Sequence, residues 1–455
     1  MGPTAAVPLA LALCLSTCSA VTAGWVGHIL SDSFSGVISL EIIDLDDDGD
    51  RDIVGAGWNA GLSWWENAGG SFEEHTVDAG FTGAIFVSPC DMDDDGDIDL
   101  LASSNGSGTI GWWENDGEEE FTGHIVTDSF PGAHSVFPCD LDDDGNSDIL
   151  AVAFEIDQVC WFRNDGDCTF TMDILSGLHD GPWTAVPCDI DDDGDEDVAV
   201  AYRLSNEVRW FRNEGGTFSD MLVDGDLDGA HVLTVLDLDL DGDSDILVTA
   251  RNADMIVWYD NDGSECFTRH TILEGYDWPT FVSAADFDQD GDLDVACAAY
   301  NDDDVSWLRN EGGTEFTRHS IESSFDGAIP VVSGDLSGDG VPDVLAGAYG
   351  LDAVTWWENT GTSLEDEGRS VYQEQFAEVF PNPSSGSLEI VPCGGLEGMM
   401  TLDIFDLCGR RVLTRLEDAS SGSCIVDMEE LPSGTYVTVL KHGESVSRSC
   451  LTLIY

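Results

Sequence analysis

The chain has 455 residues, of which 42% are hydrophobic and 9% aromatic, a composition typical of a folded globular protein. Its 15 Lys and Arg residues stand against 91 Asp and Glu residues, which gives a formal net charge of −76. This charge excludes electrostatic binding to nucleic acid or to an anionic membrane surface, and it favours the binding of cations.

Residues 1–23 have the pattern of a secretory signal peptide. An apolar run from Ala5 to Leu15 precedes small residues that end at Ala23, so cleavage would leave Gly24 as the first residue. A lipidated cysteine at Cys18 is the alternative, although Thr17 before it fits that pattern poorly. No later stretch approaches the roughly 18 uninterrupted apolar residues of a transmembrane span. We therefore expect export to an oxidising compartment.

The cysteines of the exported chain do not form an evident disulfide framework. Three of them immediately precede Asp-rich segments and are expected to be small buried apolar residues: Cys90, Cys139 and Cys188. Cys160 and Cys168 flank one hairpin turn as diagonal neighbours, a placement that does not favour a bond. Four more can pair in three ways that sequence does not separate: Cys393, Cys408, Cys424 and Cys450.

An Asp-rich segment of nine residues, called the Asp loop below, recurs seven times with a spacing of 47 to 49 residues. The seven loops start at Asp44, Asp91, Asp140, Asp189, Asp237, Asp286 and Asp335. Each runs directly into a short β-like segment, such as residues 52–56 or 197–201. A constant period of this length indicates a repeat architecture.

Each repeat carries signals for four strands. A Trp follows the first Asp of the loop by 20 or 21 residues, at Trp64, Trp112, Trp161, Trp210, Trp258, Trp307 and Trp356. Three residues after it, an Asn opens an Asn-x-Gly hairpin turn, and a Phe then begins another strand, often with a His three residues later. Four strands in this length form one propeller blade, so the sequence predicts an all-β, seven-bladed β-propeller over residues 24–361.

The two ends of the repeat array complement one another. Residues 25–28 match the Phe-x-x-His strand but have no blade before them, whereas the last copy stops at Asn359 and lacks that strand. We expect the N-terminal strand to complete the last blade and so close the ring.

The Asp loops have the donor pattern of a calcium site. Carboxylates occupy loop positions 1, 3, 5 and 9, Gly stands at position 6, and the position 7 carbonyl adds a ligand, which suits the six to eight oxygens that Ca²⁺ prefers. The loop is not an EF-hand, because position 12 is never Glu. A single Asp-Gly turn could simply cap a hairpin, but seven copies favour up to seven Ca²⁺ ions. The expected ligands are Asp44, Asp46, Asp48, Asp50 and Asp52; Asp91, Asp93, Asp95, Asp97 and Asp99; Asp140, Asp142, Asp144, Asn146 and Asp148; Asp189, Asp191, Asp193, Asp195 and Asp197; Asp237, Asp239, Asp241, Asp243 and Asp245; Asp286, Asp288, Asp290, Asp292 and Asp294; and, in the site expected to be weakest, Asp335, Ser337, Asp339, Val341 and Asp343.

With these loops, residues 25–361 resemble the FG-GAP and VCBS repeat family, whose calcium-loop units also build the heads of integrin α-subunits. The resemblance implies a propeller in which the loops join the innermost strand of each blade to the next. The Phe-Gly and Gly-Ala-Pro signatures of the family are eroded here to forms such as residues 54–58, Val-Gly-Ala-Gly-Trp. That departure leaves the subfamily and the ligand open.

The C-terminal part contains no Asp loop. Residues 362–377 form a polar linker, and residues 378–455 contain Val-Phe-Pro-Asn-Pro at 379–383, an alternating segment at 401–410 and Leu-Pro-Ser-Gly-Thr-Tyr at 431–436. In this order the segments resemble the sorting domain of the bacterial type IX secretion system. The resemblance implies display outside a Gram-negative-type cell, with the secretion machinery as a partner. The alternating patterns themselves predict a small β-sandwich, for which a generic sandwich domain is the alternative.

Three functions fit this organisation. A non-catalytic binding or adhesion module, monomeric and with an extracellular glycan or protein as ligand, is favoured, because no group of potentially catalytic residues interrupts the repeat. A secreted polysaccharide lyase or hydrolase on a propeller scaffold is the alternative, and a structural spacer is a third possibility. The recurring His and Trp residues are interpreted as structural, with the Trp in the core between blades.

Differences between the copies indicate a candidate ligand site. Eight residues before each loop stands a Gly in six copies, whereas the sixth copy has Trp278. Two residues later the copies vary most, and they include His134, Trp183 and His231. These positions begin the innermost strands, so we expect the four side chains to meet at the central channel, on the face opposite the Asp loops, where a glycan could stack on Trp.

Overall fold

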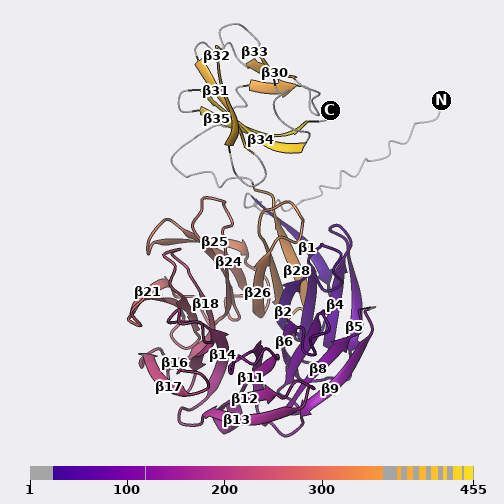
Figure 1. The fold of residues 1–455 in the computed structure, drawn as a ribbon, viewed down its shortest axis with the longest axis vertical. Coiled ribbons are helices and arrows are strands. Elements are labelled where there is room, and N and C mark those ends of the chain that lie inside the picture. The colour runs from indigo at the N-terminus through magenta and orange to yellow at the C-terminus, as the bar shows by residue number, and fades with distance from the viewer. Residues whose placement is uncertain are drawn as a thin grey trace, which may run out of the picture. The chain divides into compact units, whose positions relative to one another are not determined.

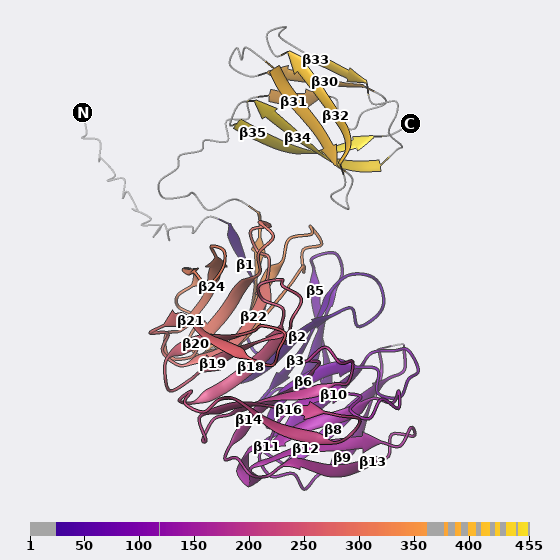
Figure 2. The same cartoon turned by 60° about the vertical axis from the view of Figure 1, so that its left-hand side comes forward.

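The computed structural model describes residues 24–117 and 119–361, together with the backbone of seven strands between residues 377 and 453. The signal peptide and the linker expected from sequence lie outside these residues, apart from position 377. The described residues fall into two compact units, divided between Leu364 and Glu365. Figures 1 and 2 show the strands of the first unit arranged in blades around a central axis.

Seven antiparallel four-stranded sheets make up the first unit, as the sequence predicted. Six of them use consecutive strands: β2 (Val37–Ile43), β3 (Asp52–Gly57), β4 (Gly61–Asn67) and β5 (Phe72–Asp78); β6 (Ala84–Cys90), β7 (Asp99–Ser104), β8 (Thr109–Asn115) and β9 (Phe121–Thr127); β10 (Ala133–Cys139), β11 (Asp148–Ala153), β12 (Gln158–Asn164) and β13 (Phe170–Ser176); β14 (Pro182–Cys188), β15 (Asp197–Tyr202), β16 (Glu207–Asn213) and β17 (Phe218–Asp224); β18 (Ala230–Leu236), β19 (Asp245–Ala250), β20 (Met255–Asn261) and β21 (Phe267–Glu274); β22 (Pro279–Ala285), β23 (Asp294–Ala299), β24 (Asp304–Asn310) and β25 (Phe316–Glu322). A short 3₁₀ helix, η1 (Phe154–Ile156), follows β11.

The seventh blade closes the ring by strand exchange, which confirms the expectation from the two chain ends. It combines β26 (Ala328–Gly334), β27 (Asp343–Ala348) and β28 (Ala353–Asn359) with the N-terminal strand β1 (Trp25–Ser31). In the antiparallel register of β1 and β28, Trp25 pairs with Asn359 and His28 with Trp356. The exchange pairs the outer edge of β28 and ties the two ends of the propeller together.

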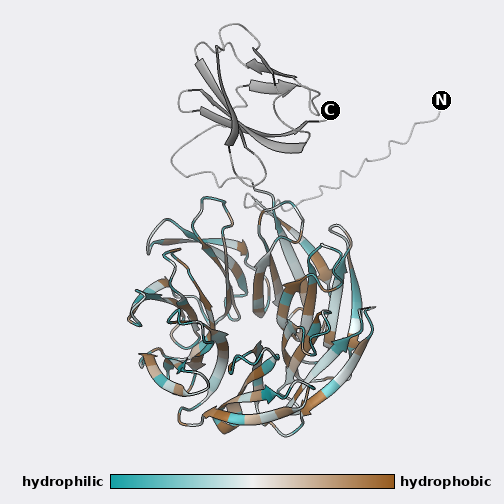
Figure 3. Ribbon diagram, viewed as in Figure 1, coloured by the Kyte–Doolittle hydropathy of each residue, from teal (hydrophilic) through white to brown (hydrophobic). Residues whose placement is uncertain are grey.

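Apolar side chains from adjacent blades pack together to form the core. Trp210 of the fourth blade lies in one cluster with Leu233 and Val248 of the fifth, and Trp258 of the fifth blade packs with Val282 and Cys297 of the sixth. All seven recurring Trp residues are buried, which confirms their interpretation as core residues. In Figure 3 the apolar residues lie mainly on the strands of the blades.

The recurring His residues are structural, as expected. The His75 ring stacks on Trp64 with centroids 4.8 Å apart, and its Nε2 lies 3.1 Å from an Oε2 of Glu66. The same arrangement of a Trp, a His and an acid recurs around His28, His124 and His270. Each His therefore links the two outer strands of its blade.

Within each blade the Asp loop joins the innermost strand to the second strand, for example β2 to β3. The start of the innermost strand and the end of the second strand lie at the opposite end of the blade, roughly 20 Å away for a seven-residue strand. The propeller therefore carries two functional candidates, one at each end of its innermost strands.

The second unit contains two antiparallel sheets. One has the order β29 (Ala377–Phe380), β30 (Ser387–Pro392) and β33 (Cys424–Asp427), and the other has the order β32 (Arg411–Asp418), β31 (Met399–Phe405), β34 (Gly434–His442) and β35 (Ser445–Leu453). The region is all-β, as predicted. Among the described residues of the whole chain, no helix has the length and apolar character needed to cross a membrane.

Deleting residues 24–31 should destabilise the propeller, because β28 would expose an unpaired edge and the ring would lose its closing strand. We expect the melting temperature of the otherwise complete chain to fall by roughly 5 °C or more. A matched control keeps the strand and replaces only Val26 and Ile29 by Ser, because these side chains are 46% and 73% exposed. Equal melting temperatures for the deletion and the control would contradict the role of β1.

Candidate metal loops and an axial cavity

Two left-handed residues shape every Asp loop. The Gly at position 6 has φ between 85° and 104° in the seven copies, where a side chain would be strained. Position 4 is also left-handed, with φ between 54° and 61° in the six copies where it is not Gly, whereas the seventh copy has Gly338 there. Two such reversals in three residues coil the loop tightly, so that its alternate carboxylates turn toward one another.

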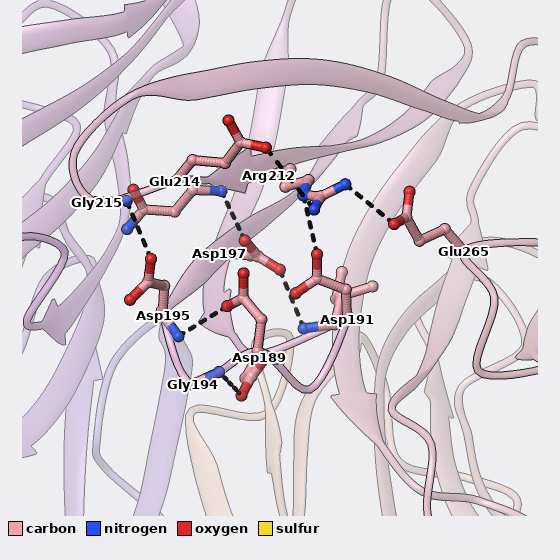
Figure 4. A network of polar contacts seen from close by, with 12 residues as sticks. Asp189, Asp191, Gly194, Asp195, Asp197, Arg212, Glu214, Gly215 and Glu265 are labelled. Carbon is pink, nitrogen blue, oxygen red and sulfur yellow. Dashed lines mark hydrogen bonds and ion pairs between the residues drawn. The ribbon is translucent and has the colours of Figure 1, made fainter.

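Carboxylates of each of the first five loops converge on one point. In the fourth loop, carboxylate oxygens of Asp189, Asp191 and Asp197 lie within 4.8 Å of one another, and the first, second, third and fifth loops have comparable groups. Asp189 also accepts hydrogen bonds from the N–H groups of Asp193 and Gly194, at 3.2 and 3.1 Å, which fixes its carboxylate over the loop (Figure 4). The arrangement concentrates negative charge within a space the size of one ion.

Oxygen atoms without partners indicate that this space suits a cation. The Asp191 side chain is only 7% exposed, and its Oδ2 lies 3.0 Å from Nε of Arg212 (Figure 4), but its Oδ1 is buried with no hydrogen-bond partner. An Oδ1 of Asp44 in the first loop is buried and unpartnered in the same way. Buried oxygens without partners are unfavourable unless something binds them. Hard oxygen donors in this number fit Ca²⁺ better than a metal that prefers nitrogen or sulfur.

The Asp at loop position 9 has a second role that the sequence did not reveal. Asp197 is fully buried, and its two oxygens accept N–H groups from Ile190 at 3.1 Å and from Asn213 at 2.7 Å. The bond to the Asn that ends the third strand recurs in all seven blades. This carboxylate therefore joins the Asp loop to the hairpin of its own blade.

Burial raises the pKa of each position 9 carboxyl, while hydrogen bonds from backbone N–H groups lower it. The pKa is raised to about 7 for Asp99, Asp197 and Asp294. It is raised to about 6 for Asp52, Asp148, Asp245 and Asp343. The direction shows that the negative charge is poorly compensated by the protein alone.

The Asn that donates its N–H to this carboxylate also bonds to the neighbouring blade through its side chain. Nδ2 of Asn213 donates to the carbonyl of Glu196 in its own blade and to that of Leu141 in the preceding blade, both at 2.9 Å. Equivalent bonds between blades are made by Asn67, Asn164, Asn261 and Asn359. The Asn67 bond, to Leu336, spans the closure between the first and seventh blades. The Asp loops are thus part of the contact between blades.

At the opposite end of the innermost strands lies an axial cavity of about 550 Å³. Its wall contains the residue six positions before each Asp loop in all seven copies: Ile38, Ile85, His134, Trp183, His231, Thr280 and Ile329. Trp278 lies in the same wall. The structure therefore brings the four sequence-predicted candidates together around one cavity.

The side chains of these candidates are already in contact with protein groups. Trp183 has the rings of His134 and His231 at centroid distances of 4.0 and 4.6 Å, and the Cζ of Arg203 lies 4.7 Å from its centroid. Burial lowers the pKa of His134 to about 3 and that of His231 well below its usual value, so both rings are neutral. Nδ1 of His134 is buried without a hydrogen-bond partner. Trp183 thus serves more as a support for Arg203 than as a free stacking surface.

A second ring of the wall was missed from sequence. It comes from the residue fourteen positions after the first Asp of each loop: Trp58, Asn105, Phe154, Arg203, Arg251, Tyr300 and Tyr349. In every blade its N–H donates to the carbonyl eight positions before the loop, as Arg251 does to Gly229 at 2.9 Å, so the two rings lie together. The residue at this position varies in size and charge from copy to copy, but so does the residue after it, so the sequence did not single it out.

Trp278 has a strained backbone. Its φ is 60°, and the Gly residues at the equivalent position of the other six blades have φ between 65° and 77°. A bulky side chain in this left-handed region costs on the order of 1–3 kcal/mol. The ring lies under Arg251, whose Cζ is 3.4 Å from its centroid, and 4.8 Å from the ring of Tyr300. Strained residues cluster at functional sites, so the conformation of Trp278 makes this cavity a candidate functional site.

Comparison with protein families gives two matches. The FG-GAP-like repeat matches residues 91–151, 140–200, 189–248, 237–297 and 286–346, so that each match runs from one Asp loop into the next and together they cover more than half of the chain. The secretion system C-terminal sorting domain matches residues 378–451. No curated protein matches the chain.

Among solved structures, the chain is similar to a crystal structure of BBS1N in complex with ARL6DN, soaked with lead. The TM-score is 0.50 at 13% identity, and the match covers 75% of this chain and 99% of that chain. A second crystal of the same complex, soaked with mercury, has a TM-score of 0.49 at 14% identity and covers 74% and 97% of the two chains. At this identity the similarity concerns the fold alone.

Substituting Asp197 by Ala should destabilise the propeller even without metal, because two buried N–H groups lose their acceptor. We expect the free energy of unfolding to fall by about 2 to 6 kcal/mol. Urea unfolding in excess chelator, followed by tryptophan fluorescence, measures this effect apart from metal binding. Asp226→Ala is the control, since this side chain is exposed, and it should change stability by less than about 0.5 kcal/mol. A similar small change for both variants would contradict the structural role of Asp197.

Proposed function

We propose, from the premise that the chain belongs to the family of FG-GAP-like repeat proteins, that it is a calcium-binding propeller that acts outside the cell as a non-catalytic binding or adhesion module. The axial cavity is the observation that carries this proposal. It is concave, largely aromatic and equipped with a few polar groups, as ligand sites usually are.

The destination of the protein follows from its C-terminal part. The sorting domain over residues 378–451 directs the protein through the type IX secretion system to the cell surface or the medium. A propeller displayed there can contact extracellular glycans or proteins directly. This setting supports a role in binding.

Calcium would serve as a structural ion in this proposal. The Asp residues at loop positions 1, 3, 5 and 9, with the position 7 carbonyl, would hold it, and the ion would neutralise their charge. The loops lie roughly 20 Å from the axial cavity, at the other end of the blades. The distance supports a role for calcium in holding the blades together rather than in contacting a ligand.

The lining of the cavity favours binding over catalysis. Glu155 is the one carboxylate in the described lining, whereas glycoside hydrolysis usually requires two that flank the bond to be cleaved. The two His residues are neutral and packed against Trp183. We therefore place the alternative, a polysaccharide-active enzyme, second.

Removing calcium should destabilise the propeller steeply, because each loop gathers carboxylates whose repulsion then has no counter-ion. With dissociation constants of about 10⁻⁴ to 10⁻³ M, each site adds about 1.4 to 2.7 kcal/mol in roughly 10 mM calcium. We expect thermal melting in excess chelator to shift far below that in calcium, with poor rescue by magnesium, which prefers a small octahedral shell. An unchanged melting curve, or a calcium content near zero by metal analysis, would contradict the assignment of the loops.

Deleting residues 378–455 should stop export at the periplasm and leave a folded propeller there. We expect the truncated chain to be absent from the cell surface and medium, and to keep the calcium-dependent melting of the propeller. Cell fractionation with an antibody to the propeller measures the first result, and melting of the purified truncated chain measures the second. Arrival of the truncated chain at the surface would show that residues 378–455 are not the export signal.

A further inference from the structure

The arginines of the propeller divide into two classes. Six have a carboxylate oxygen 2.7 to 3.0 Å away: Arg163, Arg209, Arg212, Arg269, Arg309 and Arg318. Three others have no carboxylate within 4.0 Å among the described residues, namely Arg51 in the first Asp loop and the two cavity arginines, Arg203 and Arg251. In a chain with 91 acidic residues, two partly buried arginines without a counter-ion in one cavity are an exception that requires explanation.

Aromatic rings orient both cavity arginines. Arg251 lies flat enough over Trp278 for its Cζ to approach the ring centroid to 3.4 Å, and Arg203 lies over Trp183. A guanidinium stacked in this way keeps its N–H edge free for a planar anion, and stacking limits the entropy lost on binding. The strained backbone of Trp278 places the ring that supports Arg251. The pair of arginines is therefore held ready for a ligand.

We propose that the axial cavity binds a carboxylate-bearing sugar residue, of the hexuronate class, through Arg203 and Arg251. This inference rests on the proposed binding function and names its ligand class. A carboxylate matches the guanidinium fork, and the C–H faces of a pyranose ring suit the aromatic side chains of Trp58, Tyr300 and Tyr349 in the same wall.

The charge of the whole chain limits the number of acidic groups in that ligand. At −76 the protein repels polyanions at distances up to the Debye length, about 8 Å at physiological ionic strength. The charged residues in the cavity lining are the two arginines and Glu155, whose side chain is exposed. The cavity therefore selects a single acidic residue within a mostly neutral saccharide, rather than a densely charged polymer.

Ligand-observed NMR on the calcium-loaded full chain tests this inference with three probes: methyl glucuronide, the neutral methyl glucoside, and an acetylated tripeptide with a free C-terminus. We expect the glucuronide to bind at least tenfold more tightly than the glucoside and the peptide. Arg203→Met and Arg251→Met should each weaken glucuronide binding tenfold or more, and the Lys variants should weaken it less, since they keep the charge but lose the planar fork.

Arg163→Met is the matched control, because Arg163 also lies over a Trp ring, at 5.3 Å, but is paired with Asp173 outside the cavity. It should leave glucuronide binding within twofold of the unmodified chain. Melting curves for every variant show whether the fold is kept. Replacing the unpaired cavity arginines should change the melting temperature little.

Several outcomes would overturn the inference: equal binding of glucoside and glucuronide, binding of the peptide as tight as that of the glucuronide, no binding of any probe, or binding unaffected by the cavity variants. Among these outcomes, equal binding of a neutral saccharide at the cavity would contradict the ligand class but would agree with the proposed binding function. If the chain cleaved an acidic oligosaccharide, the proposed non-catalytic function would be wrong. The proposal that the two arginines recognise an acidic sugar would still hold.

Discussion

A buried carboxylate at loop position 9 is the interaction on which the rest of the propeller depends. Asp197 and its six equivalents accept the N–H of the Asn that ends the third strand, and that Asn in turn reaches the preceding blade in five of the seven cases. Such a group is unfavourable to bury unless its hydrogen bonds are complete. The same carboxylate therefore connects the Asp loop to the hairpin in every blade, and through the Asn it connects five blades to the preceding one.

This arrangement separates the two ends of the propeller electrostatically. The Asp loops gather carboxylates at one end of the innermost strands, whereas the other end carries Arg203 and Arg251 without counter-ions. The second strands, which run beside the innermost ones, are fully buried, so that the core of each blade lies between the two ends. A scaffold that gathers carboxylates at one end can in this way place two arginines in a cavity at the other.

Some features of the cavity could not be predicted from local sequence patterns. Trp183 was expected to offer a stacking surface, but two His rings and a guanidinium, contributed by three blades, already contact it. Trp278 was noticed as an exception to a Gly position, and its left-handed backbone shows why Gly is usual there. The Cys160 and Cys168 thiols are free, as their diagonal placement indicated.

The sequence by itself determined the number of blades, the strand order within each, the closure by the N-terminal strand and the position of every Asp loop, because each of these follows from short-range periodicity and turn chemistry compared from copy to copy along the chain. The roles of Asp197 and Asn213 as links between hairpin, loop and adjacent blade, and the meeting of Arg203 and Arg251 with Trp183 and Trp278 in one cavity, were decided by the tertiary structure alone. Closing the ring places residues about 50 positions apart in the chain against one another around the axis, and that proximity has no trace in the local sequence of any single blade.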